Sequence, residues 1–241
     1  MTVIEPMQRR AELAENLARV ESRIVDAARA AGRQPSEVTL IAVTKYFPAS
    51  DVQHLSALGV SDVGENKHQE AAAKAAACAD LQVPVRWHYI GGLQSNKAAA
   101  VAAYADVVQS VDRPKLLAPL ARGASDRGRV LDVMVQVSLD GAGAAELRAG
   151  ASPADALRLA DDIAAVEHLN LVGVMAVAPL QGDPRSAFER LAQVAEKIRA
   201  AHPQARAISA GMSGDLEEAI EFGATHVRVG SAILGNRPFI K

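Results

Sequence analysis

One lysine of this sequence stands where an amine could act as a nucleophile. Lys45 follows a short apolar run at residues 40–43 and a single threonine, so its side chain is expected at the mouth of a folded sheet. Desolvation favours the neutral form of a lysine, and the neutral amine attacks carbonyl groups to form a Schiff base. Taken alone, Lys45 could equally extend into solvent or pair with Glu65. The other residues that are capable of chemistry must distinguish between these alternatives.

Two glycine-containing segments near the end of the chain are suited to a phosphate group. Residues 211–214 (Gly-Met-Ser-Gly) precede one helical segment, and residues 230–231 (Gly-Ser) precede another. Glycine lets the backbone approach an anion, and the free N–H groups of a helix start point towards it. The alternative is that Ser213 is only a helix cap and Gly230 only a tight turn. Asp215 opposes an anion unless its side chain points away.

Two further residues could face the same ligand. Arg228 lies two residues before Gly230, so strand alternation places both on one face. An inward arginine in a valine-rich strand needs a partner, which could be a ring nitrogen, a phosphate or a structural carboxylate such as Glu65. His88 either faces the mouth or is a core histidine that bonds to the backbone.

Short apolar runs alternate with helical segments along most of the chain. Strands separated by helices pair in parallel through right-handed crossovers, and eight such units favour a closed (β/α)₈ TIM barrel over an open sheet. No GxGxxG follows the first strand, which weakens a dinucleotide-binding fold. Barrels bind ligands at the carboxyl ends of their strands, often phosphate after strands seven and eight. The expected strands are residues 38–44, 62–64, 85–90, 107–111, 131–137, 171–177, 205–209 and 226–230.

An additional helix precedes this pattern. Apolar residues recur at helical spacing from Leu13 to Ala28, and Gly32 ends the helix. We therefore expect one domain over residues 1–241, with an N-terminal helix within 1–34 and the barrel over 38–237. The helix should pack on the outside of the barrel or across its bottom.

The composition limits the classes of partner. The 241 residues carry a formal net charge of −2, so nothing global attracts nucleic acid or an anionic membrane. The single cysteine, Cys78, cannot form an internal disulfide and is expected at a buried or half-buried helix position. The sequence shows neither a signal peptide pattern nor an apolar span of about 20 residues. We expect a cytoplasmic protein.

These motifs together resemble those of one family, the pyridoxal phosphate (PLP) homeostasis proteins, which are YggS-like or PROSC-like. The barrel of that family is similar to the N-terminal domain of alanine racemase. The resemblance extends from about Val38 to Arg237 in the family's order and spacing. It rests on residues 42–45 (Ala-Val-Thr-Lys), 64–66 (Gly-Glu-Asn), 87–97 (Trp-His-Tyr-Ile-Gly-Gly-Leu-Gln-Ser-Asn-Lys), 209–215 (Ser-Ala-Gly-Met-Ser-Gly-Asp) and 227–230 (Val-Arg-Val-Gly).

The resemblance implies a cofactor and a role for each matching residue. Lys45 would carry PLP as a Schiff base, and Arg228 would approach the pyridine nitrogen. An arginine keeps that nitrogen unprotonated and makes the cofactor a weak electron sink. Asn66 would line the ring, with His88 nearby. The phosphate would be held by Ser213, Gly230 and Ser231, with help from the backbone N–H groups of Met212 to Gly214.

Three positions depart from the family pattern. Phe47 stands where many members have a second lysine, and Gln109 stands where a histidine is common. A second amine that hands the cofactor on, or a role for that histidine, therefore cannot be carried over. Residues 140–143 are rich in glycine and alanine where other members carry charged residues, and we assign them no role.

A carrier is the favoured interpretation over a turnover enzyme. Racemases of this kind need a second acid/base residue from an additional domain, whereas this chain ends at Lys241 after the eighth unit, and Tyr46, Tyr89 and Tyr104 offer no obvious substitute. We expect a monomer that buffers PLP for vitamin B6 and amino acid homeostasis, with PLP-dependent apoenzymes as transient partners. The alternatives are a slow racemase or lyase that uses His88 or a water, a cofactor-free Schiff-base aldolase, and a sensor of vitamin B6.

Overall fold

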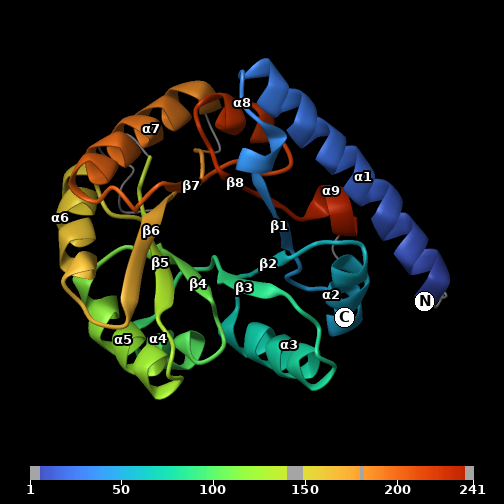
Figure 1. Cartoon of the computed structure of the whole chain (residues 1–241), viewed down its shortest axis with the longest axis horizontal. Coiled ribbons are helices and arrows are strands. Elements are labelled where there is room, and N and C mark those ends of the chain that lie inside the picture. The colour runs from blue at the N-terminus through green and yellow to red at the C-terminus, as the bar shows by residue number, and fades with distance from the viewer. Residues whose placement is uncertain (1–5, 140–148, 180–181, 237–241) are drawn as a thin grey trace.

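Eight parallel strands close into a barrel in chain order. The structure, a computed structural model, describes residues 6–139, 149–179 and 182–236, so residues 140–143 lie outside the described part. Each strand pairs in parallel with the next, and β8 pairs with β1. Figure 1 shows this ring of strands surrounded by helices. The strands are β1 (Thr39–Val43), β2 (Asp62–Glu65), β3 (Arg86–Tyr89), β4 (Val107–Val111), β5 (Leu131–Gln136), β6 (Leu169–Met175), β7 (Ala207–Ser209) and β8 (His226–Val229).

The prediction of a (β/α)₈ barrel is confirmed, and all eight expected strands are present. The fourth has the expected bounds, five others differ by one residue at one or both ends, and two differ by more. The sixth begins and ends two residues earlier than expected, and the seventh has only three residues. Every strand is followed by a helix. These helices are α2 (Ala49–Ala57), α3 (His68–Asp80), α4 (Ser95–Ala102), α5 (Leu117–Asp126), α6 (Pro153–Ala164), α7 (Pro184–Ala201), α8 (Leu216–Glu221) and α9 (Ser231–Leu234).

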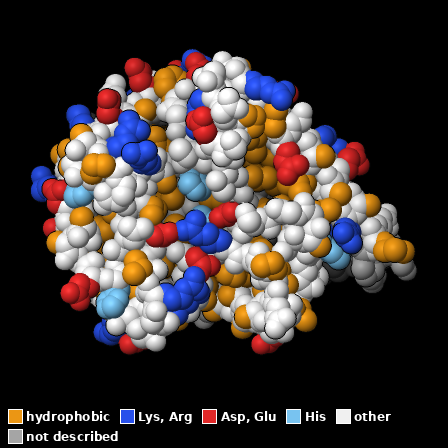
Figure 2. Space-filling view, in the orientation of Figure 1, with side chains coloured by type: hydrophobic (Ala, Val, Ile, Leu, Met, Phe, Trp, Pro, Cys, Tyr) orange, Lys and Arg blue, Asp and Glu red, His pale blue; other side chains and the backbone are white. Residues whose placement is uncertain are grey.

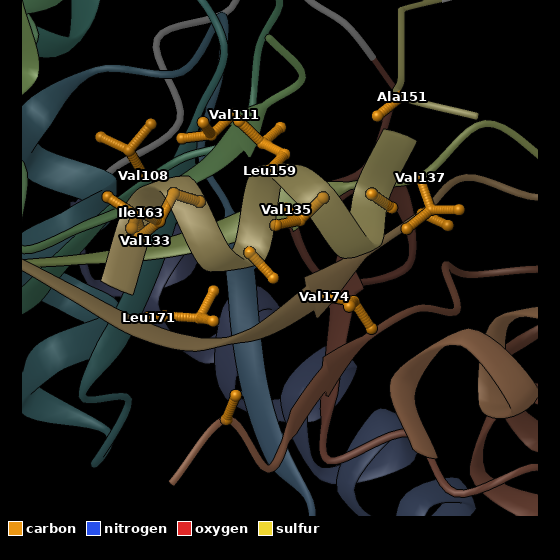
Figure 3. Close-up of a cluster of buried hydrophobic side chains, with 14 of the residues drawn as sticks. Val108, Val111, Val133, Val135, Val137, Ala151, Leu159, Ile163, Leu171 and Val174 are labelled. Atoms are coloured by element: carbon orange, nitrogen blue, oxygen red, sulfur yellow. The ribbon is translucent and has the colours of Figure 1, made fainter. Parts of the chain in front are cut away.

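Aliphatic side chains fill the layer between the strands and the helices. Figure 3 shows one part of it, where Leu159 and Ile163 of α6 lie among valines of the neighbouring strands. Phe188 of α7 belongs to the same cluster and is 2% exposed. Cys78 is buried on α3 and packs beside Trp87 of β3, as the sequence predicted. Burial of this apolar surface is the main source of stability, at about 25 cal/mol per Å².

Strand alternation sends every second side chain into the barrel itself. Val107, Met134 and Met175 pack there as a small apolar cluster. Neighbouring interior positions are polar: His88 and Gln109 are also fully buried. The barrel interior is therefore mixed rather than aliphatic throughout.

The N-terminal helix α1 (Pro6–Ala30) lies on the outside of the barrel, beside α8 and α9 (Figure 1). Its predicted apolar face, with Leu13 and Leu17, is buried there. Polar contacts fix its position, because Asn16 Nδ2 donates to the carbonyl of Ile233 at 2.8 Å and Arg23 Nη2 donates to the carbonyl of Ser213 at 3.0 Å. The helix thus supports the segments that follow β7 and β8.

The surface carries charges of both signs. Figure 2 shows acidic and basic side chains interspersed over one face. In the described part of the chain, no helix is long and apolar enough to cross a membrane, and no group of three His, Cys, Asp or Glu residues is arranged to hold a metal ion.

The close approach of β6 to β7 requires glycine at position 173. A Cβ atom at Gly173 would lie 1.8 Å from the carbonyl oxygen of Ala207, and the residue has φ +156°. We expect Gly173→Ala to lower the free energy of unfolding by about 3 kcal/mol, since backbone atoms must move. Gly92→Ala is the matched control, because nothing lies within 4 Å of a Cβ atom there. Urea unfolding of both variants checks this, and equal stabilities would contradict it.

Candidate functional site

Lys45 lies in the turn after β1 and is half-buried. The next residue, Tyr46, has φ +73°, and its N–H donates to the carboxylate of Glu70 on α3. The Nζ atom of Lys45 lies 5.9 Å from the centroid of the Tyr46 ring, and that of Lys67 lies 5.2 Å from it. No carboxylate among the described residues lies within 4.0 Å of the Lys45 amine. The alternative in which Glu65 pairs with Lys45 is therefore wrong.

Glu65 pairs instead with Lys74, a residue that the sequence analysis did not single out. Lys74 Nζ donates to Oε1 of Glu65, to Oε1 of Glu70 and to the carbonyl of Thr44, each at 2.7 Å. Burial raises the pKa of the Glu65 carboxyl, although Lys74 and the Thr44 hydroxyl donate to it. This buried cluster fixes the backbone immediately before Lys45. A signal did exist, because Lys74 lies at helical spacing within the apolar face of α3 that includes Ala71 and Cys78.

The loops after β7 and β8 bring two hydroxyl groups together. Ser231 Oγ lies 3.4 Å from Ser213 Oγ. Gly230 adjoins the end of β1, since a Cβ atom there would lie 3.2 Å from the carbonyl oxygen of Val43. Both loops therefore lie on the side of the mouth where Lys45 stands.

The backbone of residues 212–214 is only partly available to an anion. The N–H of Met212 donates to the Asp215 carboxylate at 2.6 Å, so the predicted contribution of Met212 would require Asp215 to move. The N–H groups of Ser213 and Gly214 donate to no group in the described part of the chain. Two hydroxyls and two N–H groups thus remain for a phosphate.

Arg228 is buried inside the barrel, with 4% of its surface exposed. Its Nη1 donates to Ser209 Oγ at 2.7 Å and its Nη2 to the carbonyl of Ala176 at 2.8 Å. Burial lowers the pKa of its guanidinium to about 10, so it remains charged at neutral pH. No carboxylate in the described residues is within ion-pair distance, and Glu65 is occupied by Lys74. Three of the five guanidinium N–H groups remain for a ligand.

His88 and Asn66 differ in whether their side chains are available to a ligand. His88 is 1% exposed, and its two ring nitrogens lie 2.8 Å from Asp62 Oδ1 and 2.9 Å from Gln109 Nε2. It is a core histidine, as one of the two sequence interpretations had it, but its partners are side chains. Asn66 is half-buried at the end of β2, and its buried Oδ1 has no hydrogen-bond partner among the described residues.

The mouth thus combines four chemical features. Among the described residues, it has an amine with no carboxylate within 4.0 Å, two facing hydroxyls with adjacent N–H donors, a buried cation with no counter-ion in contact, and an amide oxygen with no hydrogen-bond partner. An aromatic aldehyde that bears a phosphate and a ring nitrogen could use all four. The residues present therefore fit PLP.

Known proteins share both this sequence and this fold. A family model described as the N-terminal domain of alanine racemase matches residues 15–238. A pyridoxal phosphate homeostasis protein of Mycobacterium bovis is 43% identical over 243 residues, which cover 95% of this chain and 94% of that protein. The chain belongs to the pyridoxal phosphate homeostasis protein family. The resemblance stated from its motifs is confirmed.

Solved structures agree with this assignment. The structure of PipY from Synechococcus elongatus with PLP bound is 33% identical, has a TM-score of 0.80, and covers 92% of this chain and 100% of its own. Alanine racemase from Streptomyces coelicolor is 17% identical with a TM-score of 0.72, over 93% of this chain and 58% of the racemase. That second likeness concerns the fold alone.

The Lys74 cluster can be tested by its effect on stability. We expect Lys74→Met to lower the free energy of unfolding by about 3 kcal/mol near neutral pH, because it leaves the buried Glu65 carboxylate without its cation. The pKa of Glu65, already raised by burial, should rise further. The folded state then binds more protons than the unfolded state, so stability falls as pH rises through this range.

The loss caused by Lys74→Met should therefore be larger at about pH 8 than at about pH 5. Urea unfolding at both pH values measures it. Lys67→Met is the matched control, because Lys67 is exposed at the start of the same helix. A loss that is independent of pH would show that Lys74 does not compensate Glu65.

Proposed function

We propose that this protein binds pyridoxal 5′-phosphate as a Schiff base on Lys45 and holds it for PLP homeostasis. The observation that carries the proposal is that the segment bearing Ser231, whose hydroxyl faces that of Ser213, adjoins the end of β1 just before Lys45, an amine with no carboxylate within 4.0 Å among the described residues. An aldehyde and a phosphate on one small ring match these two features. The family to which the chain belongs supports the same ligand.

The geometry supports the remaining contacts that we propose for the cofactor. The N–H groups of Ser213 and Gly214 donate to the phosphate together with the two hydroxyls. Arg228 donates to the pyridine nitrogen, which satisfies one of its unused N–H groups. Because a guanidinium does not give up its proton, the nitrogen stays unprotonated, and the bound cofactor is a weak electron sink. PLP supplies the aldehyde that the lysine amine attacks.

A holding role is favoured over turnover by the acid/base groups around the site. The Tyr89 hydroxyl donates to the carbonyl of Asn66 at 3.4 Å. Tyr104 stacks on His68, and burial raises the pKa of its hydroxyl. Both ring nitrogens of His88 are engaged inside the barrel. None of these described groups is poised to move a proton on a substrate, whereas a racemase needs such a group. Transfer to apoenzymes and a monomeric state remain predictions.

The attachment to Lys45 predicts a spectroscopic result. Wild-type protein incubated with PLP should show a visible absorption band, and borohydride should fix the ligand onto the peptide that contains Lys45. Lys45→Ala should lose both the band and the fixed peptide. Lys67→Ala is the control, since Lys67 faces the same tyrosine ring but is exposed. A wild-type protein that neither develops the band nor binds PLP would overturn the proposal.

The phosphate cradle predicts a selective loss of affinity. We expect the double variant Ser213→Ala, Ser231→Ala to bind PLP about 10- to 100-fold more weakly, since two hydrogen bonds to a charged group are removed. Its affinity for unphosphorylated pyridoxal should change little. Absorbance titrations with both ligands measure this. Equal losses for the two ligands would place the phosphate elsewhere.

A further inference from the structure

A row of buried polar side chains crosses the interior of the barrel. Its members come from five different strands, and each is at most 7% exposed. We call them the interior row. They are Asp62 of β2, His88 of β3, Gln109 of β4, Ser209 of β7 and Arg228 of β8.

Hydrogen bonds connect the interior row without a gap. Arg228 Nη1 lies 2.7 Å from Ser209 Oγ, which in turn lies 2.7 Å from Gln109 Oε1. Gln109 Nε2 lies 2.9 Å from His88 Nδ1. His88 Nε2 lies 2.8 Å from Asp62 Oδ1. The row therefore links the cation proposed to meet the ring nitrogen with a carboxylate on the other side of the barrel.

The two ends of the interior row set the direction of every bond. A guanidinium can only donate and a carboxylate can only accept. The Ser209 hydroxyl accepts from Arg228, so it gives its own proton to Gln109. The Gln109 amide then donates to His88 Nδ1, which leaves the proton of the neutral imidazole on Nε2, where it donates to Asp62. Burial lowers the pKa of His88, in agreement with the neutral form.

The charges of the row also balance. Arg228 has no carboxylate in contact among the described residues. Asp215 acts on it through space, and Asp62 carries the negative charge at the far end of the row. The pKa of Asp62 is lowered, because hydrogen bonds from His88 and Ser61 outweigh its burial. Arg86 is paired with Asp132. The ring of His226 lies 6.3 Å from that of His88, and burial lowers its pKa to about 4, so it is neutral.

Apolar neighbours keep the row dry. Val107 pairs with His88 across β3 and β4, and Met175 pairs with Ser209 across β6 and β7. Both apolar residues are 1% exposed. In such surroundings hydrogen bonds in a chain polarise one another, so a charge at one end is felt at the other.

We propose that Asp62, His88, Gln109 and Ser209 are positioning residues, which supply the counter-charge of Arg228 across the barrel and so set its hydrogen bond to the cofactor's ring nitrogen. The inference rests on the proposed function, in which Arg228 makes that bond. Gln109 is the central link, because it alone joins the histidine to the serine. Its amide suits this position, since the oxygen must accept from Ser209 and the nitrogen must donate to His88.

Two substitutions test separately the negative charge of Asp62 and the hydrogen-bond connection through Gln109. Asp62→Asn keeps an oxygen that accepts from His88 but removes the charge. Gln109→Leu keeps a similar volume but breaks the row at its centre. Met175→Leu is the matched control, because Met175 is equally buried and lies outside the row. Circular dichroism of each variant first establishes that it is folded.

The measurement is the dissociation constant for PLP and for its carbocyclic analogue, in which a C–H replaces the ring nitrogen. Asp62→Asn and Gln109→Leu should each weaken PLP binding about 3- to 10-fold, as expected for one weakened charge-assisted hydrogen bond. Neither should change binding of the analogue, which offers Arg228 no acceptor. Met175→Leu should change neither constant by more than about twofold.

Combining the two substitutions tests whether Asp62 acts on Arg228 through Gln109. If Asp62 acts through Gln109, then Asp62→Asn should have no added effect on PLP affinity in the Gln109→Leu background. Additive losses, equal losses for both ligands, or unchanged affinities in folded variants would each overturn the inference. A wild-type protein that does not bind PLP would instead overturn the proposed function, and this inference with it.

Discussion

The charge of Arg228 inside a closed barrel is the constraint on which much of this structure depends. Transfer of an ion from water to a protein interior costs several kcal/mol unless other groups compensate it. Here the carbonyl of Ala176 and the Ser209 hydroxyl accept directly from the guanidinium, and the charge of Asp215 acts on it through space. Barrel interiors are usually filled by branched aliphatic residues. Ser209 occupies such a place and accepts directly from the cation, and Gln109 accepts from Ser209.

The same strand connects the cation to the rest of the mouth. Arg228 is the third residue of β8, and the strand continues directly into Gly230 and Ser231. Helix α1 then fixes the segments after β7 and β8 from outside, through Arg23 at Ser213 and Asn16 at Ile233. The groups proposed for the ring nitrogen and the phosphate are therefore held by one continuous set of contacts. A helix that appears external to the barrel contributes to the geometry of its mouth.

Local sequence patterns predicted the fold well and the site less well. The alternation of strands and helices depends on neighbouring residues, so the sequence pattern could reveal it. The bounds of β6 lie two residues earlier than predicted, because Gly173 and the exposed Asn170 interrupt the apolar pattern. The partners of Arg228 depend instead on barrel register. Gln109 and Ser209 are 100 positions apart, and no local spacing brings them together. For the same reason the sequence did not predict that Asp62 and Gln109 engage the two ring nitrogens of His88.

Lys45 and Lys74 show how such long-range contacts determine which charges surround an amine. Both are lysines near Glu65, and the sequence offered no means to assign the carboxylate to one of them. In the structure Lys74 takes Glu65 and Glu70 together. An unpaired carboxylate beside Lys45 would favour its charged ammonium form, which is not a nucleophile. The buried ion pair between α3 and β2 therefore links these two elements and also takes up the negative charge of Glu65, which could otherwise act on the amine proposed to react.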